Sequence, residues 1–108
     1  MTHYYIFKTN KVTGEITHIC NGSHEGEDLC RIHWQGYMYG FMDAAFEMLG
    51  RENFQMMQSR EHKLGFEFHI PANNHTVEFF MLLDDAGQQL IQDISRKVAL
   101  GKEEVQLR

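Results

Sequence analysis

Proline, cysteine and long apolar runs are all scarce in this chain. Its 108 residues contain one proline, Pro71, and two cysteines, Cys20 and Cys30. Two cysteines cannot build the disulfide framework that stabilises many small secreted domains. No apolar run reaches the roughly 20 residues that a membrane-spanning helix needs. We therefore expect neither a disulfide scaffold nor a membrane protein.

The N-terminus also lacks a secretory signal. Residues Met1 to Lys8 contain no basic segment followed by a long apolar run, which is the pattern of a signal peptide. We expect a cytoplasmic protein, in which a reducing environment keeps both cysteines as thiols.

Basic clusters and reaction motifs are missing as well. Ten basic residues against fifteen acidic ones give a formal net charge of −5, and the basic residues are scattered. Direct nucleic-acid binding is therefore not expected, because it needs basic residues grouped on one surface. The chain has no Gly-x-Ser-x-Gly motif, no phosphate-binding glycine loop and no His-Glu-x-x-His. These absences favour a protein that is not an enzyme.

Aromatic residues and methionine, in contrast, are plentiful. Hydrophobic residues make up 43% of the chain, including eight Phe and seven Met, which is ample for a packed core. Since 108 residues is about the commonest size of one domain, we expect a single domain over residues 1–108.

The N-terminal half indicates a hairpin followed by a long helix. Tyr4 to Lys8 and Glu15 to Cys20 are rich in aromatic and β-branched residues, and Asn10 and Gly14 suit the turn between them. From Glu27 to about Gly50, apolar residues recur at steps of three and four, which predicts an amphipathic helix. We also expect a second, short helix from Arg51 to about Arg60.

The C-terminal half indicates a second hairpin and a final helix. Strands are predicted at Leu64 to Ile70 and at Thr76 to Leu83, the latter apolar on both faces, with a turn at Pro71 to Asn74. A helix is predicted from Asp84 or Asp85 onward. The order β-β-α-β-β-α predicts a two-layer α+β fold with an antiparallel sheet. Whether the hairpins join into one sheet depends on tertiary contacts.

The two cysteines and two histidines lie close together in sequence, as Cys20-x3-His24-x5-Cys30-x2-His33. Zinc prefers thiolate and imidazole ligands, so these four residues are candidate zinc ligands. The tight Cys-x2-4-Cys pair of established zinc modules is missing, however. The alternative is that Cys20 and Cys30 pack in the core, since free cysteine behaves as a small apolar residue.

A second group of histidines, His62, His69 and His75, lies near the second hairpin. His69 and His75 flank the Pro71 turn and are candidate cross-strand neighbours, which could bind a metal or act as acid and base. Exposed strand histidines are the alternative.

Glycine inside the long helix is the most informative pattern. Gly36-x3-Gly40-x3-Ala44 places small residues on one helix face, although glycine in a helix interior costs about 1 kcal/mol relative to alanine. Packing within the chain, on the sheet or the C-terminal helix, is one explanation. The alternative is a subunit or partner interface formed by large and small residues together: Trp34, Gly36, Tyr37, Met38, Tyr39, Gly40 and Ala44.

These observations favour a small non-enzymatic protein that docks on a protein partner, as inhibitors, immunity proteins and regulatory adaptors do. A homodimer is expected, because the long helix is apolar on more than one face. No cofactor is expected under this hypothesis. The alternatives are a zinc-binding protein that uses the Cys20 to His33 group, and a small-ligand binder with a pocket between the long helix and the sheet.

Overall fold

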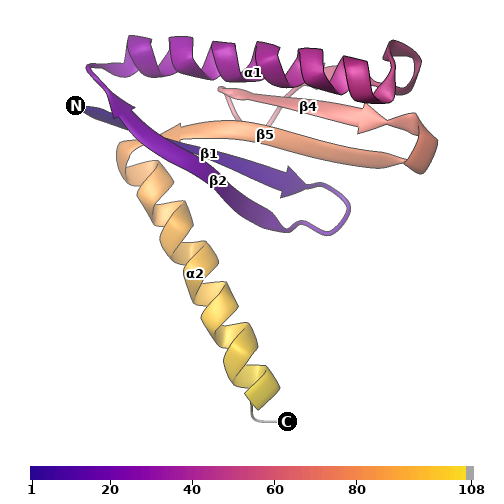
Figure 1. The fold of residues 1–108 in the computed structure, drawn as a ribbon. Helices are drawn as coiled ribbons and strands as arrows, with labels where there is room; N and C mark the ends of the chain where they lie inside the picture. The colour runs from indigo at the N-terminus through magenta and orange to yellow at the C-terminus, as the bar shows by residue number, and fades with distance from the viewer. Residues whose placement is uncertain (107–108) are drawn as a thin grey trace.

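Five antiparallel strands and two long helices make up the fold (Figure 1). The computed structural model describes the backbone of residues 1–106 and the side chains of residues 1–100. None of the helices in this part of the chain combines the length and apolar character needed to cross a membrane. The elements in chain order are β1 (Thr2–Asn10), β2 (Ile16–His24), α1 (Glu27–Leu49), the short 3₁₀ helix η1 (Arg51–Asn53), β3 (Gln55–Gln58), β4 (Gly65–Ile70), the 3₁₀ turn η2 (Pro71–Asn73), β5 (His75–Leu83) and α2 (Asp84–Gln106).

The two hairpins join into one sheet through β1 and β5. These strands pair antiparallel from Tyr4 opposite Leu83 to Asn10 opposite Val77. The strand order is therefore β2-β1-β5-β4-β3, with β1, β5 and β4 inside and β2 and β3 at the edges. The α+β class, the antiparallel sheet and the order of its main elements are confirmed.

The expected short helix from Arg51 to about Arg60 is confirmed only over Arg51–Asn53. The rest of that prediction is wrong, because Gln55–Gln58 forms the edge strand β3, paired with β4. A helix of this length is marginal unless it packs well, whereas a strand gains hydrogen bonds from β4. Phe54, which precedes the strand, is buried against Phe46 and Phe68, with ring centroids 4.9 and 5.2 Å away.

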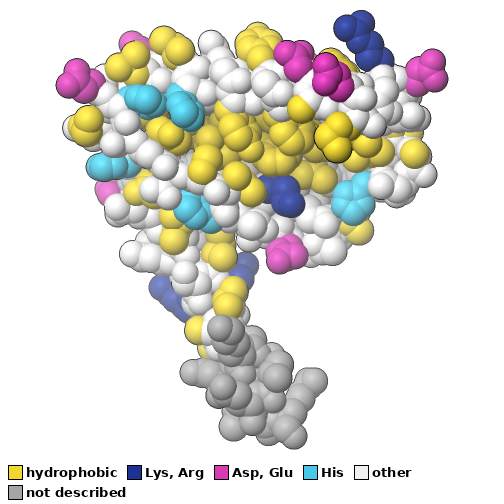
Figure 2. All heavy atoms as spheres, in the orientation of Figure 1, with side chains coloured by type: hydrophobic (Ala, Val, Ile, Leu, Met, Phe, Trp, Pro, Cys, Tyr) yellow, Lys and Arg dark blue, Asp and Glu magenta, His cyan; other side chains and the backbone are white. Residues whose placement is uncertain are grey.

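The helix α1 covers one face of the sheet with an aromatic core. Trp34 and Phe41 of α1 pack on rings of β4 and β5, and the Phe41 centroid lies 4.7 Å from that of Phe79. Figure 2 shows the hydrophobic side chains gathered in the layer below this helix. The buried residues of this core are Tyr4, Ile6, Cys30, Trp34, Ala45, Phe54, Phe66, Phe68, Phe79 and Met81.

The helix α2 packs on the opposite face and then runs on beyond the sheet (Figure 1). Tyr5, Phe7 and Phe80 form a smaller core there, against the partly buried Leu90, Ile91 and Ile94 among others. Side chains alternate between faces along a strand, so Phe79 belongs to the α1 core and Phe80 to the α2 core. The predicted covering of this strand on both faces is confirmed.

Gly87, in the first turn of α2, tests how closely that helix lies on β1. A Cβ atom there would come within 2.6 Å of Cγ of the buried Tyr5 ring. Gly87→Ala should destabilise the fold by about 1–3 kcal/mol, because the ring cannot move away without disturbing its core. Urea unfolding followed by circular dichroism measures this. Unchanged stability would contradict this packing of α2.

Candidate functional site

The side of α1 that faces away from the sheet is exposed and partly apolar. Ile32 is 62% exposed and Tyr39 is 57% exposed. Along the top of Figure 2, where Figure 1 places α1, hydrophobic and acidic side chains lie together. We call this surface the outer α1 face; its exposed residues are Leu29, Ile32, Gly36, Tyr39, Gly40, Asp43, Ala44 and Glu47.

Neither Gly36 nor Gly40 packs against the rest of the described chain. A Cβ atom built at either position would meet no described atom within 4 Å. The expectation that the small-residue stripe packs on the sheet or on α2 is therefore wrong. The two glycines lie on the side of α1 opposite to its buried residues, which include Cys30, Trp34 and Ala45.

The other expected interface residues divide between the surface and the core. Trp34 is buried, with its ring stacked on Tyr37 and tilted against Phe66. Tyr37 and Met38 are half-buried and pack against the same core. Of the seven residues predicted as an interface, the structure exposes Gly36, Tyr39, Gly40 and Ala44.

Of the Cys/His group, the structure brings the two histidines together. His24, at the end of β2, has Nε2 at 3.4 Å from Nδ1 of His33, in the second turn of α1. Both rings pack against Tyr4, with centroids 5.5 and 4.6 Å from its ring. Both thiols are near the same Tyr4, and Cys30 Sγ donates to the carbonyl oxygen of Thr2 and lies by the backbone of His24, while Cys20 packs at the edge of the α1 core.

Both thiols are free, and burial disfavours the ionised form of each. Burial raises the pKa of Cys20, and it also raises the pKa of Cys30, whose thiol lies near the acidic Asp84 and Glu27. Zinc binds the thiolate and not the thiol. In the part of the chain that the structure describes, the group whose ligand atoms lie close enough to hold a metal is a different one: Glu61, His62 and Glu78.

The histidines near the second hairpin also separate. The register places His69 opposite Thr76, and His69 Nδ1 lies 2.9 Å from the Thr76 hydroxyl; His75 lies opposite Ile70. The His62 ring stacks on Phe80, with centroids 3.8 Å apart and planes 7° apart. Its Nε2 lies 3.6 Å from Oε1 of Glu78.

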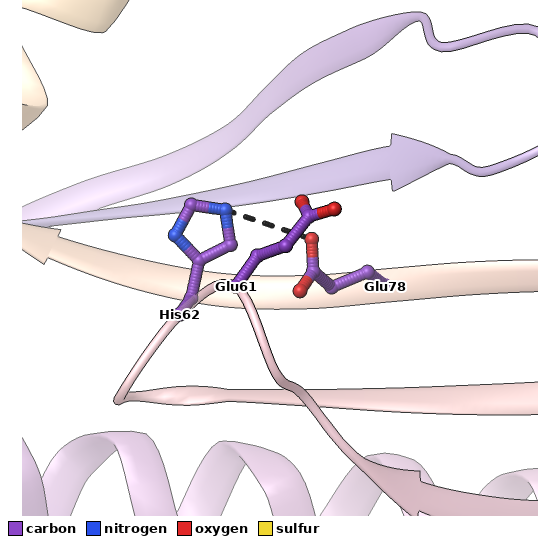
Figure 3. Close-up of side chains that lie close together, drawn as sticks. All are labelled: Glu61, His62 and Glu78. Carbon is purple, nitrogen blue, oxygen red and sulfur yellow. Dashed lines mark ion pairs between the residues drawn. The ribbon is translucent and has the colours of Figure 1, made fainter.

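A polar cluster surrounds Glu78 on the α2 side of the sheet. Glu78 is fully buried in β5, and its carboxylate accepts a hydrogen bond from Ser59 of the β3–β4 loop, residues 59–64. Figure 3 shows Glu61 and His62 of that loop beside Glu78. We call this group the Glu78 cluster; it consists of Lys11, Ser59, Glu61, His62, Glu67 and Glu78.

Lys11 places a positive charge among the carboxylates of the Glu78 cluster. Its Nζ lies 3.0 Å from Glu61, 3.5 Å from Glu67 and 3.7 Å from Glu78, measured to the nearest carboxylate oxygen. Burial opposes the charge on Lys11, but the hydrogen bond to Glu61 and the neighbouring carboxylates outweigh it, and the pKa of Lys11 is raised. The hydrogen bond with Lys11 and its charge in turn lower the pKa of Glu61.

Sequence reasoning missed most of the Glu78 cluster. One feature could have revealed its centre: Glu78 lies within Thr76 to Leu83, a run predicted to be apolar on both faces. An acid in such a strand is buried, and a buried carboxylate needs partners. Lys11 and Glu61 gave no comparable indication, because they belong to a turn and a loop whose paths depend on tertiary contacts.

A cleft of about 480 Å³ opens between α1 and the β3–β4 edge of the sheet. Trp34, Met38, Met56 and Phe66 give it an apolar lining, and the basic side chains of Arg31 and Lys63 also line it. This size and lining suit a small, flat, apolar ligand.

Comparisons with protein-family models, with curated proteins and with solved structures found no match to this chain. The function is therefore argued from the geometry of its own residues.

The state of the thiols gives a direct prediction. Iodoacetamide near neutral pH should modify Cys30 only after urea unfolds the protein, because the buried, protonated thiol is a poor nucleophile. Tandem mass spectrometry of native and unfolded samples identifies the modified cysteine. Rapid modification of Cys30 in the native protein would indicate an accessible thiolate, and would again favour the Cys20 to His33 group as zinc ligands.

Proposed function

We propose that this chain is a small non-enzymatic binding protein, of the inhibitor, immunity-protein or regulatory-adaptor type, that docks on a protein partner, and that it forms a homodimer through the outer α1 face. The observation that carries the proposal is the open space beside Gly36 and Gly40. The exposed Ile32 and Tyr39 beside them add apolar surface of the kind enriched at interface cores.

Gly36 and Gly40 are costly residues inside a helix. Each lowers helix stability by about 1 kcal/mol relative to alanine. No contact within the described chain offsets this cost, since no described atom would lie within 4 Å of an added Cβ atom. Small residues four apart do allow another helix to approach closely and gain dispersion contacts along its backbone. Contacts formed on docking would then offset the helix stability that Gly36 and Gly40 cost.

We propose a second copy of this chain as the occupant of the outer α1 face. A two-fold axis midway between Gly36 and Gly40 would place two α1 helices antiparallel, with Gly36 of one copy opposite Gly40 of the other. The same axis sets Ile32 of each copy opposite Ala44 of the other, so apolar residues face each other on both sides of the axis.

The cellular setting is part of the same proposal. Two free thiols and no disulfide suit a reducing compartment, so we place the protein in the cytoplasm. The net charge of −5, without a basic cluster, supports a protein partner over nucleic acid.

Sedimentation velocity at micromolar concentrations tests the docking face. The wild-type protein should sediment as a dimer, and Gly36→Gln should raise the dissociation constant by about tenfold or more, because a side chain in a close helix contact costs about 1–3 kcal/mol. Gln35→Ala, at an exposed position one residue along the same helix, should leave the dimer intact.

The folded state of the Gly36 variant is not in doubt, because glutamine is a better helix former than glycine by roughly 0.5–1 kcal/mol. Its urea midpoint under conditions that dissociate the dimer should therefore rise. A wild-type protein that sediments as a monomer would contradict the second copy as occupant, as would a dimer that Gly36→Gln leaves unchanged.

The cleft beside Trp34 supports a second candidate function, the binding of a small flat ligand. Trp34 is the single tryptophan of the chain and lines the cleft. An anionic aromatic probe such as naphthoate should change Trp34 fluorescence, and Lys63→Glu should weaken that response through charge repulsion. A fluorescence titration that stays flat would count against this function.

A further inference from the structure

We propose that the Glu78 cluster binds one divalent transition-metal ion of the Zn²⁺ class, with Glu61, His62 and Glu78 as its protein ligands. This site is separate from the outer α1 face and from the Cys20 to His33 group. The inference does not depend on the proposed docking function.

The three ligand atoms already converge. The nearest carboxylate oxygens of Glu61 and Glu78 and a ring nitrogen of His62 all lie within 4.8 Å of one another. Figure 3 shows the three side chains grouped between the β3–β4 loop and strand β5. Ligand bonds to zinc are about 2.0–2.2 Å long, so the groups must draw together by roughly an ångström. Glu61 can make most of that movement, because its side chain is 66% exposed.

One buried carboxylate oxygen of Glu78 has no hydrogen-bond donor. Oε1 of Glu78 accepts no hydrogen bond from any described residue. The nearest positive or ring nitrogens, His62 Nε2 at 3.6 Å and Lys11 Nζ at 3.7 Å, are beyond hydrogen-bonding distance. An unsatisfied buried carboxylate oxygen is costly. A metal ion between Glu61, His62 and Glu78 would satisfy it.

The charge of the Glu78 cluster also calls for a cation. Glu67 and Glu78 lie directly opposite each other on β4 and β5, and like charges in that position repel. With Glu61 there are three carboxylates, and Lys11 supplies one full positive charge against them. Glu61 is exposed, but Glu78 is fully buried and Glu67 is mostly buried, and removing carboxylates from water without enough positive charge is unfavourable. A divalent ion corrects this imbalance.

Lys11 acts as an internal competitor of the metal. Its Nζ lies 3.0 Å from the Glu61 carboxylate, which is one of the proposed metal ligands. The two cations repel, so Lys11 must swing away when the metal binds. Its long side chain is 22% exposed and has a path to solvent. Loss of the Lys11 charge should therefore tighten metal binding, whereas loss of a ligand weakens it.

The ligand set selects the metal. One imidazole nitrogen and two carboxylate oxygens suit Zn²⁺ or a neighbouring transition metal, whereas Mg²⁺ and Ca²⁺ prefer oxygen ligands alone. The bound ion would join the β3–β4 loop to the central strand β5. Binding should consequently raise the thermal stability of the folded protein.

Isothermal titration of the tag-free 108-residue chain with ZnCl₂ tests the site. The wild-type protein should bind one Zn²⁺, and excess Mg²⁺ should not compete. His62→Phe keeps an aromatic ring on Phe80 while removing the nitrogen ligand, so it should fold and bind Zn²⁺ about 10–100-fold more weakly. Glu61→Gln, at an exposed position, should weaken binding in the same direction. Lys11→Met should strengthen it.

Matched controls separate this site from the other histidines. His75→Phe should leave Zn²⁺ affinity unchanged, and so should His24→Gln. A wild-type chain without measurable Zn²⁺ binding would overturn the proposal. So would affinity that His24→Gln abolishes and His62→Phe leaves intact, which would assign zinc to the Cys20 to His33 group. Weaker binding by Lys11→Met would also contradict the proposal.

Discussion

The pairing of β1 with β5 holds the two halves of this fold together. It joins two hairpins that the sequence specifies separately, and it places β5 in the middle of the sheet with cover on both faces. Each residue of β5 is thereby assigned to one of two environments: Phe79 to the α1 core and Phe80 to the α2 core. A one-residue slip would exchange the two sets and expose both.

Both candidate sites are consequences of this central strand. Glu78 shares a face with Phe80, so it is buried by its position and gathers Ser59, His62 and Lys11 around it. The α1 core, meanwhile, uses only one side of its helix. The exposed apolar residues and open glycines that remain on the other side are features the chain does not need for its own fold.

Local sequence patterns predicted most of the fold. The alternation in Leu64 to Ile70 and Thr76 to Leu83, the helical period after Glu27 and the turn at Pro71 all depend on neighbouring residues, and these predictions are confirmed. The edge strand β3 was missed because its stability comes from pairing with β4. Whether the side of α1 that carries Gly36 is covered by another part of the chain could not be predicted, because that depends on which elements pack against the helix. The Glu78 cluster unites residues from a turn, a loop and two strands, so only tertiary structure reveals it.

Native mass spectrometry of the tag-free protein at micromolar concentration shows directly whether a second copy occupies the outer α1 face. The main species should have twice the 12.7 kDa chain mass, and it should shift to single chains when Gly36 is replaced by glutamine. A single-chain mass for the wild-type protein at that concentration would contradict the homodimer.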